Sequence, residues 1–270
     1  MKLLAVLVNY GDEQLSYLEQ VVTALKRFKK YEVTVIVQSN IPLEIKGIDI
    51  VNVVVLNNYQ LLPLTCRKEI WKRKDEYDVF IYGENDHLFL EKHVDKHIEY
   101  SSFLPENRIP GLIQYENDGG DFYYVGYHSH FDWDYDSVEI HNGKKFAYFS
   151  NTHQATFILT KKQLEKVGNT INFKKLIRYK PFYLYNNFAN SIRKKFKKPI
   201  VEPFRYSLKC KVNTDVYDFG GMKKVICISE FEDNRIHHLP NLYIEGLKGR
   251  RKLNSDEDRM RFALQKMLKN

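Results

Sequence analysis

Two acidic residues, Glu84 and Asp86, directly follow an apolar run of the sequence and could hold a divalent cation. Residues 79–82 have the composition of a buried strand, and Gly83 leads from them to Glu84-Asn85-Asp86. Side chains two residues apart on an extended strand point to the same side, so both carboxylates could face one site. Mg²⁺ and Mn²⁺ take oxygen ligands, commonly one or two carboxylates together with substrate phosphates. The pair therefore predicts a nucleotide-dependent transferase, and an ordinary solvated turn is the alternative.

The first ninety residues contain the elements that would position this pair. Apolar strands are predicted at residues 3–8, 33–37, 49–56 and 79–82, and amphipathic helices at 12–28 and 64–74. Alternation of strands and helices predicts a mainly parallel sheet with helices on both faces. Ligands of such sheets bind at the carboxyl ends of the strands. We therefore expect Asn9, Tyr10, Gln38 and the acidic pair to meet in one crevice.

Residues 91–270 predict a second, acceptor-binding half that mixes short strands with helices. Short strands are expected at 122–127, 138–140, 145–149, 155–159 and 224–229. Asn142-Gly143 is a hairpin turn signal, and a capping box at residues 160–163 begins a further helix. The residues from Ser255 onward predict a C-terminal helix. Because no repeat or low-complexity linker divides the chain, we expect one domain over residues 1–270, with a nucleotide-binding half at 1–90.

The chain is basic, and its charge is unevenly distributed. Lys and Arg outnumber Asp and Glu by 42 to 34, and much of the excess lies at residues 193–198 and 248–252. Such runs are commonly solvated, but they could also meet anionic lipid, nucleic acid or a phosphorylated substrate. Three widely spaced cysteines suit free thiols in a reducing compartment. We expect a cytoplasmic protein, and peripheral membrane contact through the aromatic and basic residues 179–198 stays open.

This layout resembles the glycosyltransferases of the GT-A fold. In that family a Rossmann-like half binds a sugar nucleotide, and an Asp-x-Asp motif after a buried strand holds the metal on the diphosphate. Glu84-Asn85-Asp86 stands at the corresponding place with Glu as its first residue, so the resemblance gives Asp86 more weight than Glu84. The strings at residues 62–67 and 236–241 also resemble members of this superfamily. The resemblance implies Mn²⁺ or Mg²⁺ as cofactor.

The resemblance also implies further site residues. A late histidine, His237 or His238, is expected as another metal ligand, and adjacent side chains of an extended segment cannot both point at one ion. Arg67 and Lys68 could face the diphosphate and offset the charge on the leaving group. The base and ribose are expected to meet the residues at the first two strand ends, Asn9, Tyr10 and Gln38.

The general base of an inverting enzyme would be a carboxylate of the second half. It deprotonates the acceptor hydroxyl, and the candidates are Glu202, Asp215 and Asp218. Gly220-Gly221, after the last of them, could be a flexible loop that closes over the acceptor. A retaining enzyme needs no such base, and the sequence leaves both outcomes open.

We therefore expect a metal-dependent hexosyltransferase-like enzyme. Its donor would be a nucleoside diphosphate sugar, with UDP favoured, and its acceptor a glycan, a glycolipid or another lipid-linked or protein-linked group. A nucleotidyltransferase that forms the sugar nucleotide is one alternative, although residues 8–13 lack its usual Gly-rich basic signature. A non-catalytic basic nucleic-acid-binding protein is the other, but the basic runs match no recognisable motif, so nucleic acid is not an expected partner.

Overall fold

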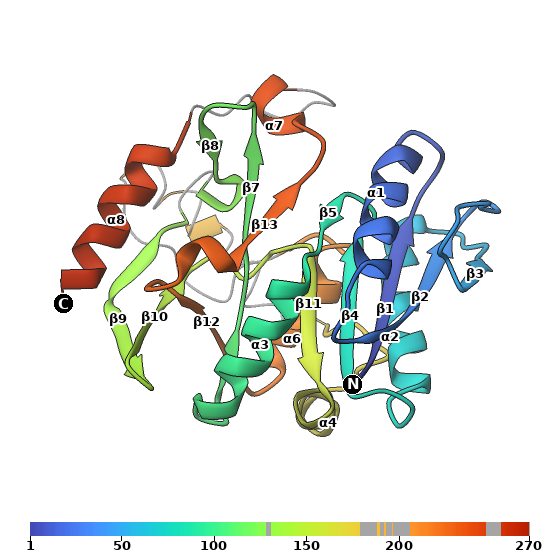
Figure 1. Ribbon diagram of the computed structural model, residues 1–270, viewed down its shortest axis with the longest axis horizontal. Coiled ribbons are helices and arrows are strands. Elements are labelled where there is room, and N and C mark those ends of the chain that lie inside the picture. The colour runs from blue at the N-terminus through green and yellow to red at the C-terminus, as the bar shows by residue number, and fades with distance from the viewer. Residues whose placement is uncertain are drawn as a thin grey trace.

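The computed structural model describes residues 1–127, 131–178, 206–246 and 255–269, together with residues 188–189, 192 and 196. Glu202 and most of the aromatic and basic stretch 179–198 lie outside these residues. A large sheet that includes the N-terminal strands lies beside two smaller sheets and the C-terminal helix (Figure 1). Among the described residues, no helix combines the length and the apolar character needed to cross a bilayer.

The large sheet has the strand order β11-β4-β1-β2-β3. Its four parallel strands are β1 (Lys2–Asn9), β2 (Glu32–Ser39), β3 (Ile50–Val53) and β4 (Val79–Glu84). The antiparallel edge strand β11 (Thr156–Thr160) comes from the second half of the sequence and pairs with β4. The predicted α/β class with a mainly parallel sheet is confirmed, and residues beyond position 91 help to complete this sheet.

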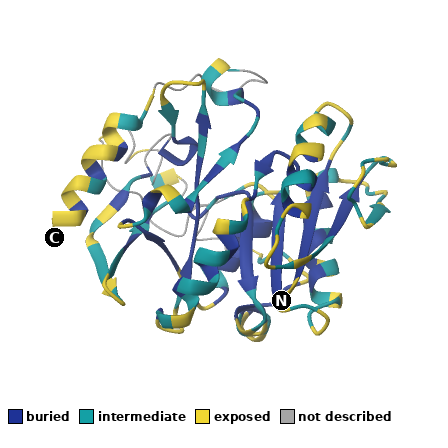
Figure 2. Ribbon diagram, viewed as in Figure 1, coloured by how far each residue is buried: buried dark blue, intermediate teal, exposed yellow. Residues whose placement is uncertain are grey.

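Helices cover both faces of the large sheet. Alternate residues of β1 pack toward α1 (Leu15–Lys26) on one face and toward α2 (Leu62–Lys72) on the other. Because β1 is buried on both faces, its sequence is a nearly continuous apolar run, and Figure 2 shows this sheet as the most deeply buried part of the molecule. Helices α4 (Lys161–Thr170) and α6 (Lys211–Phe219) pack on the same side as α2.

Helix α1 begins at Leu15, three residues after the predicted start at position 12. The chain first turns at Gly11, whose φ of +70° lies in the left-handed region that glycine adopts without strain. The Gly11 N–H donates to Asn40 Oδ1 over 2.7 Å, which ties this turn to the end of β2. The segment between β1 and α1 therefore stays near the strand ends, where it borders the cleft described below.

The second half, together with β5, forms two four-stranded sheets with the orders β6-β12-β10-β9 and β5-β13-β7-β8. The first contains β6 (Arg108–Pro110), β12 (Lys223–Cys227), β10 (Lys144–Phe149) and β9 (Trp133–His141). The second contains β5 (His87–Leu88), β13 (Arg235–His238), β7 (Ile113–Asn117) and β8 (Phe122–Tyr123). The hairpin predicted around Asn142-Gly143 is confirmed as β9–β10.

The remaining helices connect and cover these sheets. They are α3 (Glu91–Phe103), α7 (Leu242–Glu245) and α8 (Glu257–Lys269), with the 3₁₀ turns η1 (Tyr59–Leu61), η2 (Val125–Tyr127) and η3 (Phe231–Asn234). The C-terminal helix predicted from Ser255 is confirmed as α8, which buries Met260, Ala263 and Met267. The strand predicted at residues 122–127 is divided between β8 and η2.

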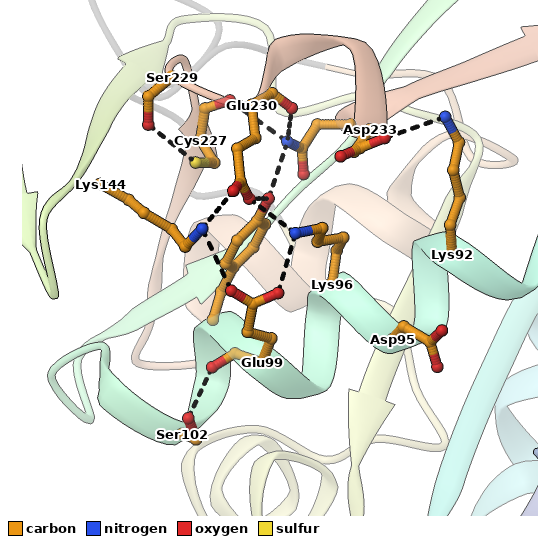
Figure 3. A network of polar contacts seen from close by, with 12 residues as sticks. Lys92, Asp95, Lys96, Glu99, Ser102, Lys144, Cys227, Ser229, Glu230 and Asp233 are labelled. Atoms are coloured by element: carbon orange, nitrogen blue, oxygen red, sulfur yellow. Dashed lines mark hydrogen bonds and ion pairs between the residues drawn. The ribbon is translucent and has the colours of Figure 1, made fainter.

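An ion network around Glu230 links α3 to β10 (Figure 3). Glu230 accepts hydrogen bonds from Tyr100 Oη at 2.7 Å, from Lys96 Nζ at 2.9 Å and from Lys144 Nζ. Glu99 pairs with the same two lysines. Burial alone would raise the pKa of Glu230, but the three hydrogen bonds lower it to about 2. The network therefore stabilises the contact between α3 and β10 only while Glu230 is ionised.

We expect Glu230→Gln to lower the free energy of unfolding near neutral pH by about 1–2 kcal/mol, because charge-assisted hydrogen bonds at a partly exposed site are lost. The folded-state pKa lies below the ordinary value of 4.5, so this stabilisation is complete above that value and disappears as the pH falls toward 2. Urea denaturation of both proteins between pH 3 and pH 7 should show the difference narrowing with acid. Glu99→Gln is the matched control and should have the smaller effect, since Glu99 is more exposed.

Candidate metal centre and adjoining cleft

The acidic motif lies on a turn rather than on a continuous strand. Strand β4 ends at Glu84, the chain turns at Asn85-Asp86, and β5 begins at the next residue. Asn85 Nδ2 donates to Asn9 Oδ1 over 2.7 Å, which holds the turn against the end of β1. The prediction that Glu84 and Asp86 pair rested on the alternation of a continuous strand, and the turn at Asn85-Asp86 interrupts that strand. Asp86 is buried, whereas Glu84 is partly exposed.

Asp86 meets two histidines instead. Its Oδ1 lies 2.7 Å from His87 Nδ1, and its Oδ2 lies 3.3 Å from His238 Nε2. The two imidazole rings are 4.9 Å apart because His87 of β5 and His238 of β13 are direct partners in an antiparallel pair. One ligand atom from each of the three side chains lies within 4.8 Å of the other two. We refer to Asp86, His87 and His238 as the metal cluster.

The cluster has the properties of a cation site. All three residues are at most 7% exposed. Despite the short distance between them, Asp86 Oδ1 and His87 Nδ1 have no hydrogen-bond partner among the described residues, and both are buried. Leaving buried polar atoms unpartnered costs about 1–3 kcal/mol each, and a bound cation would satisfy them. Two imidazole nitrogens and one carboxylate suit a first-row transition metal. The group includes Asp86 and one of the two late histidines that the resemblance implied as ligands.

Side chains behind the cluster fix the two rings. The Gln114 amide nitrogen lies 2.5 Å from His87 Nε2. His238 Nδ1 donates to Glu116 Oε1 over 2.7 Å, and Glu116 also accepts the backbone N–H groups of Tyr243 and Ile244. A carboxylate behind a ligating histidine orients the ring and raises its basicity. Glu116 is not among the residues expected from the sequence, since no local pattern pairs β7 with β13.

The same contacts set the protonation of the cluster. Burial lowers the pKa of His238, but its hydrogen bonds to Asp86 and Glu116 outweigh this and raise the pKa to about 9. Burial would raise the pKa of Asp86, yet the neighbouring His87 and His238 hold it well below its ordinary value. A metal ion that binds Nε2 of His238 must therefore displace a proton from that atom.

We expect Glu116→Gln to weaken divalent-metal binding by about 10–100-fold, the usual cost of losing a carboxylate behind a ligating histidine. Isothermal titration with Mn²⁺ at pH 7.5 would measure the change. His237→Gln is a matched control, because this adjacent ring stacks on Tyr115 at 4.8 Å and lies outside the metal cluster. Equal losses in the two variants would contradict the role of Glu116.

A cleft of about 670 Å³ adjoins the cluster at the carboxyl ends of β1 and β4. Its walls come from the segment after β1, from η1 and its flanks, from the end of β4 and from Lys209. Tyr10 is 62% exposed, and its ring lies 5.3 Å from that of Tyr59, so the cleft has an aromatic side. Gln14 lines the cleft and donates through Nε2 to Asp86 Oδ2 over 3.2 Å, so it connects the cleft to the metal cluster.

The other residues expected at the strand ends have different positions. Asn9 and Gln38 are buried at 1% and 3% exposure. Asn9 joins the ends of three strands through Gly11 O, Ser39 Oγ and Asn85 Nδ2, so it shapes the cleft from below. Lys68 is exposed on α2 and is absent from the cleft lining. Of these predicted donor-binding residues, Tyr10 is the one that lines the cleft.

Arg67 and Asp215 lie inside the protein, contrary to the expectation that they serve the diphosphate and the acceptor. Both side chains have no exposed surface. Arg67 donates to the carbonyl of Phe173 over 2.7 Å and lies 3.8 Å from Asp215, which also pairs with Lys211 at 2.9 Å. Burial lowers the pKa of Arg67 to about 10 and raises the pKa of Asp215. These residues join α2 to α6, so they have no place in the mechanism proposed below.

Asp218 borders a different pocket. This pocket of about 490 Å³ lies at the carboxyl end of α6 and is also lined by Tyr217, Gly221 and Lys224. Glu202, the third carboxylate expected as a base, is outside the described residues.

Comparisons with known proteins give a distant structural likeness. No family model matches the sequence, and no curated protein matches it significantly. Among solved structures, residues 1–349 of the glycosyltransferase TarS from S. aureus are similar over 99% of this chain and 71% of that chain, with 9% identity and a TM-score of 0.47. A likeness this distant does not indicate a shared site or a shared substrate.

Proposed function

We propose that the protein is a divalent-metal-dependent glycosyltransferase that uses a nucleoside diphosphate sugar, with UDP as the favoured nucleotide. The observation that carries the proposal is the position of the metal cluster. Asp86, His87 and His238 lie at the carboxyl end of a mainly parallel sheet and next to an open cleft. This is the edge at which α/β sheets bind their ligands.

The cleft suits a nucleotide at one end and a diphosphate at the other. Its volume of about 670 Å³ falls within the usual range of ligand sites. Tyr10 and Tyr59 offer a ring face on which a base could stack. Asn57, Asn58 and Gln60 add amide groups for the ribose and base. The diphosphate would then lie toward Gln14 and Asp86.

The chemistry depends on the cluster. When bound, the metal would hold the diphosphate oxygens and neutralise the charge that develops on the leaving group. Because imidazole ligands suit transition metals better than Mg²⁺, the donor set favours Mn²⁺ of the two ions expected from the sequence. The protein supplies Asp86 as the anionic ligand, Glu116 to orient His238, and Gln14 to hold Asp86 toward the cleft.

The acceptor is proposed to be a glycan or a lipid-linked or protein-linked sugar. The described part of the chain places no predicted catalytic carboxylate in the cleft, since Asp215 is in the core and Asp218 lines another pocket. A retaining reaction, which needs no such base, is compatible with this arrangement.

Thermal stabilisation by UDP, GDP, CMP and their sugar derivatives, with and without Mn²⁺, tests the proposal, because a ligand of the native state raises the melting temperature. We expect a shift that requires both one nucleotide and the metal. Tyr10→Ala should reduce the nucleotide-dependent part and leave Mn²⁺ binding intact. Release of pyrophosphate from a nucleoside triphosphate would favour the nucleotidyltransferase instead. The absence of any metal-dependent shift would reject the donor assignment.

A further inference from the structure

A cysteine, a histidine and a serine meet beside the cleft, outside the metal cluster. Cys210 Sγ lies 3.6 Å from His153 Nε2 and accepts a hydrogen bond from Ser207 Oγ over 3.1 Å. His153 reaches the sulfur from the segment before β11, and Cys210 directly precedes α6. Two side chains therefore contact one sulfur atom, an imidazole and a hydroxyl.

Asn213 holds the imidazole in position. In the amide orientation that pairs every donor with an acceptor, the Asn213 nitrogen donates to His153 Nδ1 at 2.8 Å and to the Cys210 carbonyl at 3.0 Å. The Asn213 oxygen then accepts a hydrogen bond from the Gln154 N–H. With Nδ1 accepting a hydrogen bond, the ring proton lies on Nε2 and faces the sulfur. The sulfur then has two hydrogen-bond donors, and hydrogen bonds to a charged form stabilise that form.

The surroundings of the three cysteines differ strongly. Cys66 and Cys227 are 0% and 1% exposed, whereas Cys210 is partly exposed. Burial raises the pKa of the Cys66 thiol well above its ordinary value. Burial also raises the pKa of the Cys210 thiol, but His153 and Ser207 together outweigh this and bring the pKa below its ordinary value. Thiolates, not thiols, are the nucleophiles in exchange reactions.

The sulfur is close to the candidate donor cleft. Lys209, the residue before Cys210, lines the cleft, and so does Glu84. Glu84 is near enough for its charge to raise the pKa of both the Cys210 thiol and the His153 ring. A group attached to Sγ would therefore lie near the wall of the cleft.

We propose that Cys210 is a modification site, a nucleophilic thiolate that forms mixed disulfides with small disulfide compounds beside the cleft. The thiolate attacks one sulfur of the reagent, the bond between Cys210 Sγ and that sulfur forms, and the reagent's own S–S bond breaks. The other half of the reagent leaves as a thiolate, so the protein thiol is oxidised and the reagent is reduced without a further oxidant. This reactivity does not depend on the proposed glycosyl transfer.

Reaction of the native protein with 5,5′-dithiobis(2-nitrobenzoate) tests the proposal, since each modified thiol releases one coloured thiolate. The chain has three cysteines, so we expect one to react rapidly in the native state and the other two only after denaturation. Peptide mapping should place the rapid reaction at Cys210, and Cys210→Ser should abolish it. Rapid reaction at Cys66 or Cys227, or none in the native protein, would overturn the proposal.

The pH dependence of the rate distinguishes an activated thiolate from a merely accessible thiol. The rate should rise with pH and reach a plateau once the thiol is ionised. We expect the midpoint of this rise to lie below the ordinary cysteine pKa of about 8.5. His153→Gln and Ser207→Ala should move this midpoint upward and slow the reaction at pH 7, by about tenfold for each unit of change. Continued protection of Cys66 and Cys227 shows that each variant is folded. A wild-type midpoint at the ordinary value that neither variant moves would reject the activation.

Discussion

Replacing Asp86 with Asn is expected to abolish metal-dependent nucleotide binding and turnover while the protein stays folded. Asp86 is the one anionic ligand of the cluster, and its two oxygens contact His87 and His238. The loss of a ligand should exceed the cost of losing a residue behind a ligand, so Mn²⁺ affinity is expected to fall by more than about 100-fold. Isothermal titration with Mn²⁺ and thermal stabilisation by the nucleotide with Mn²⁺ would measure both effects.

Glu84→Gln is the matched control for this experiment. It removes one carboxylate from the same acidic motif, but Glu84 lines the cleft and lies outside the metal cluster. We therefore expect Mn²⁺ affinity to change little. If Glu84→Gln lowered the affinity for Mn²⁺ as much as Asp86→Asn did, the ion would be held by the carboxylate pair predicted from the sequence and not by the histidines.

The sequence predicted the edge of the sheet at which the candidate metal centre lies, but it did not predict all members of the metal cluster. The apolar run of β4 and the polar residues after it placed a functional edge at the strand ends, because a fully buried parallel strand leaves a clear pattern. It did not reveal the turn at Asn85-Asp86, which a motif of three polar residues does not distinguish from a continuing strand. His87 follows Asp86 directly, and only the turn makes both available to one ion.

Long-range pairing explains the rest of what the sequence could not provide. His238 reaches Asp86 because β13 pairs with the two-residue strand β5, some 150 positions earlier in the chain. Glu116 supports His238 because β7 lies on the other side of β13. Neither contact leaves a local periodic signal. Alternation along β13, by contrast, was predictable from the sequence: His238 belongs to the metal cluster, while the adjacent His237 stacks on Tyr115.

The position of Arg67 on its helix could have been read from the sequence, because it falls on the apolar face of α2. On α2 the buried residues include Pro63, Cys66, Arg67 and Ile70, which have the spacing of one helix face. A cation on the apolar face of a helix requires a buried partner, and Asp215 is that partner. The charge of Arg67 alone suggests a diphosphate-binding residue, but its position on the apolar face of α2 places it in the core.

Asp215→Asn is therefore expected to act on stability and not on chemistry. It leaves Arg67 and Lys211 buried with no carboxylate between them, and breaking a buried ion pair costs about 3–5 kcal/mol. For a chain of this length the melting temperature should fall by about 10 °C. Urea denaturation would measure the loss, and Asp218→Asn, at a partly exposed position of the same helix, should cost less than about 1 kcal/mol.

The activity of the folded fraction separates the two roles of Asp215. At a temperature well below the transition, Asp215→Asn should keep the nucleotide-dependent and Mn²⁺-dependent stabilisation, because the residue lies in the core between α2 and α6 and outside the cleft. A variant that keeps its melting temperature but loses turnover would restore Asp215 as the acceptor base expected from the sequence. A variant that loses stability and keeps turnover would instead show that Asp215 serves the fold by neutralising Arg67 and Lys211.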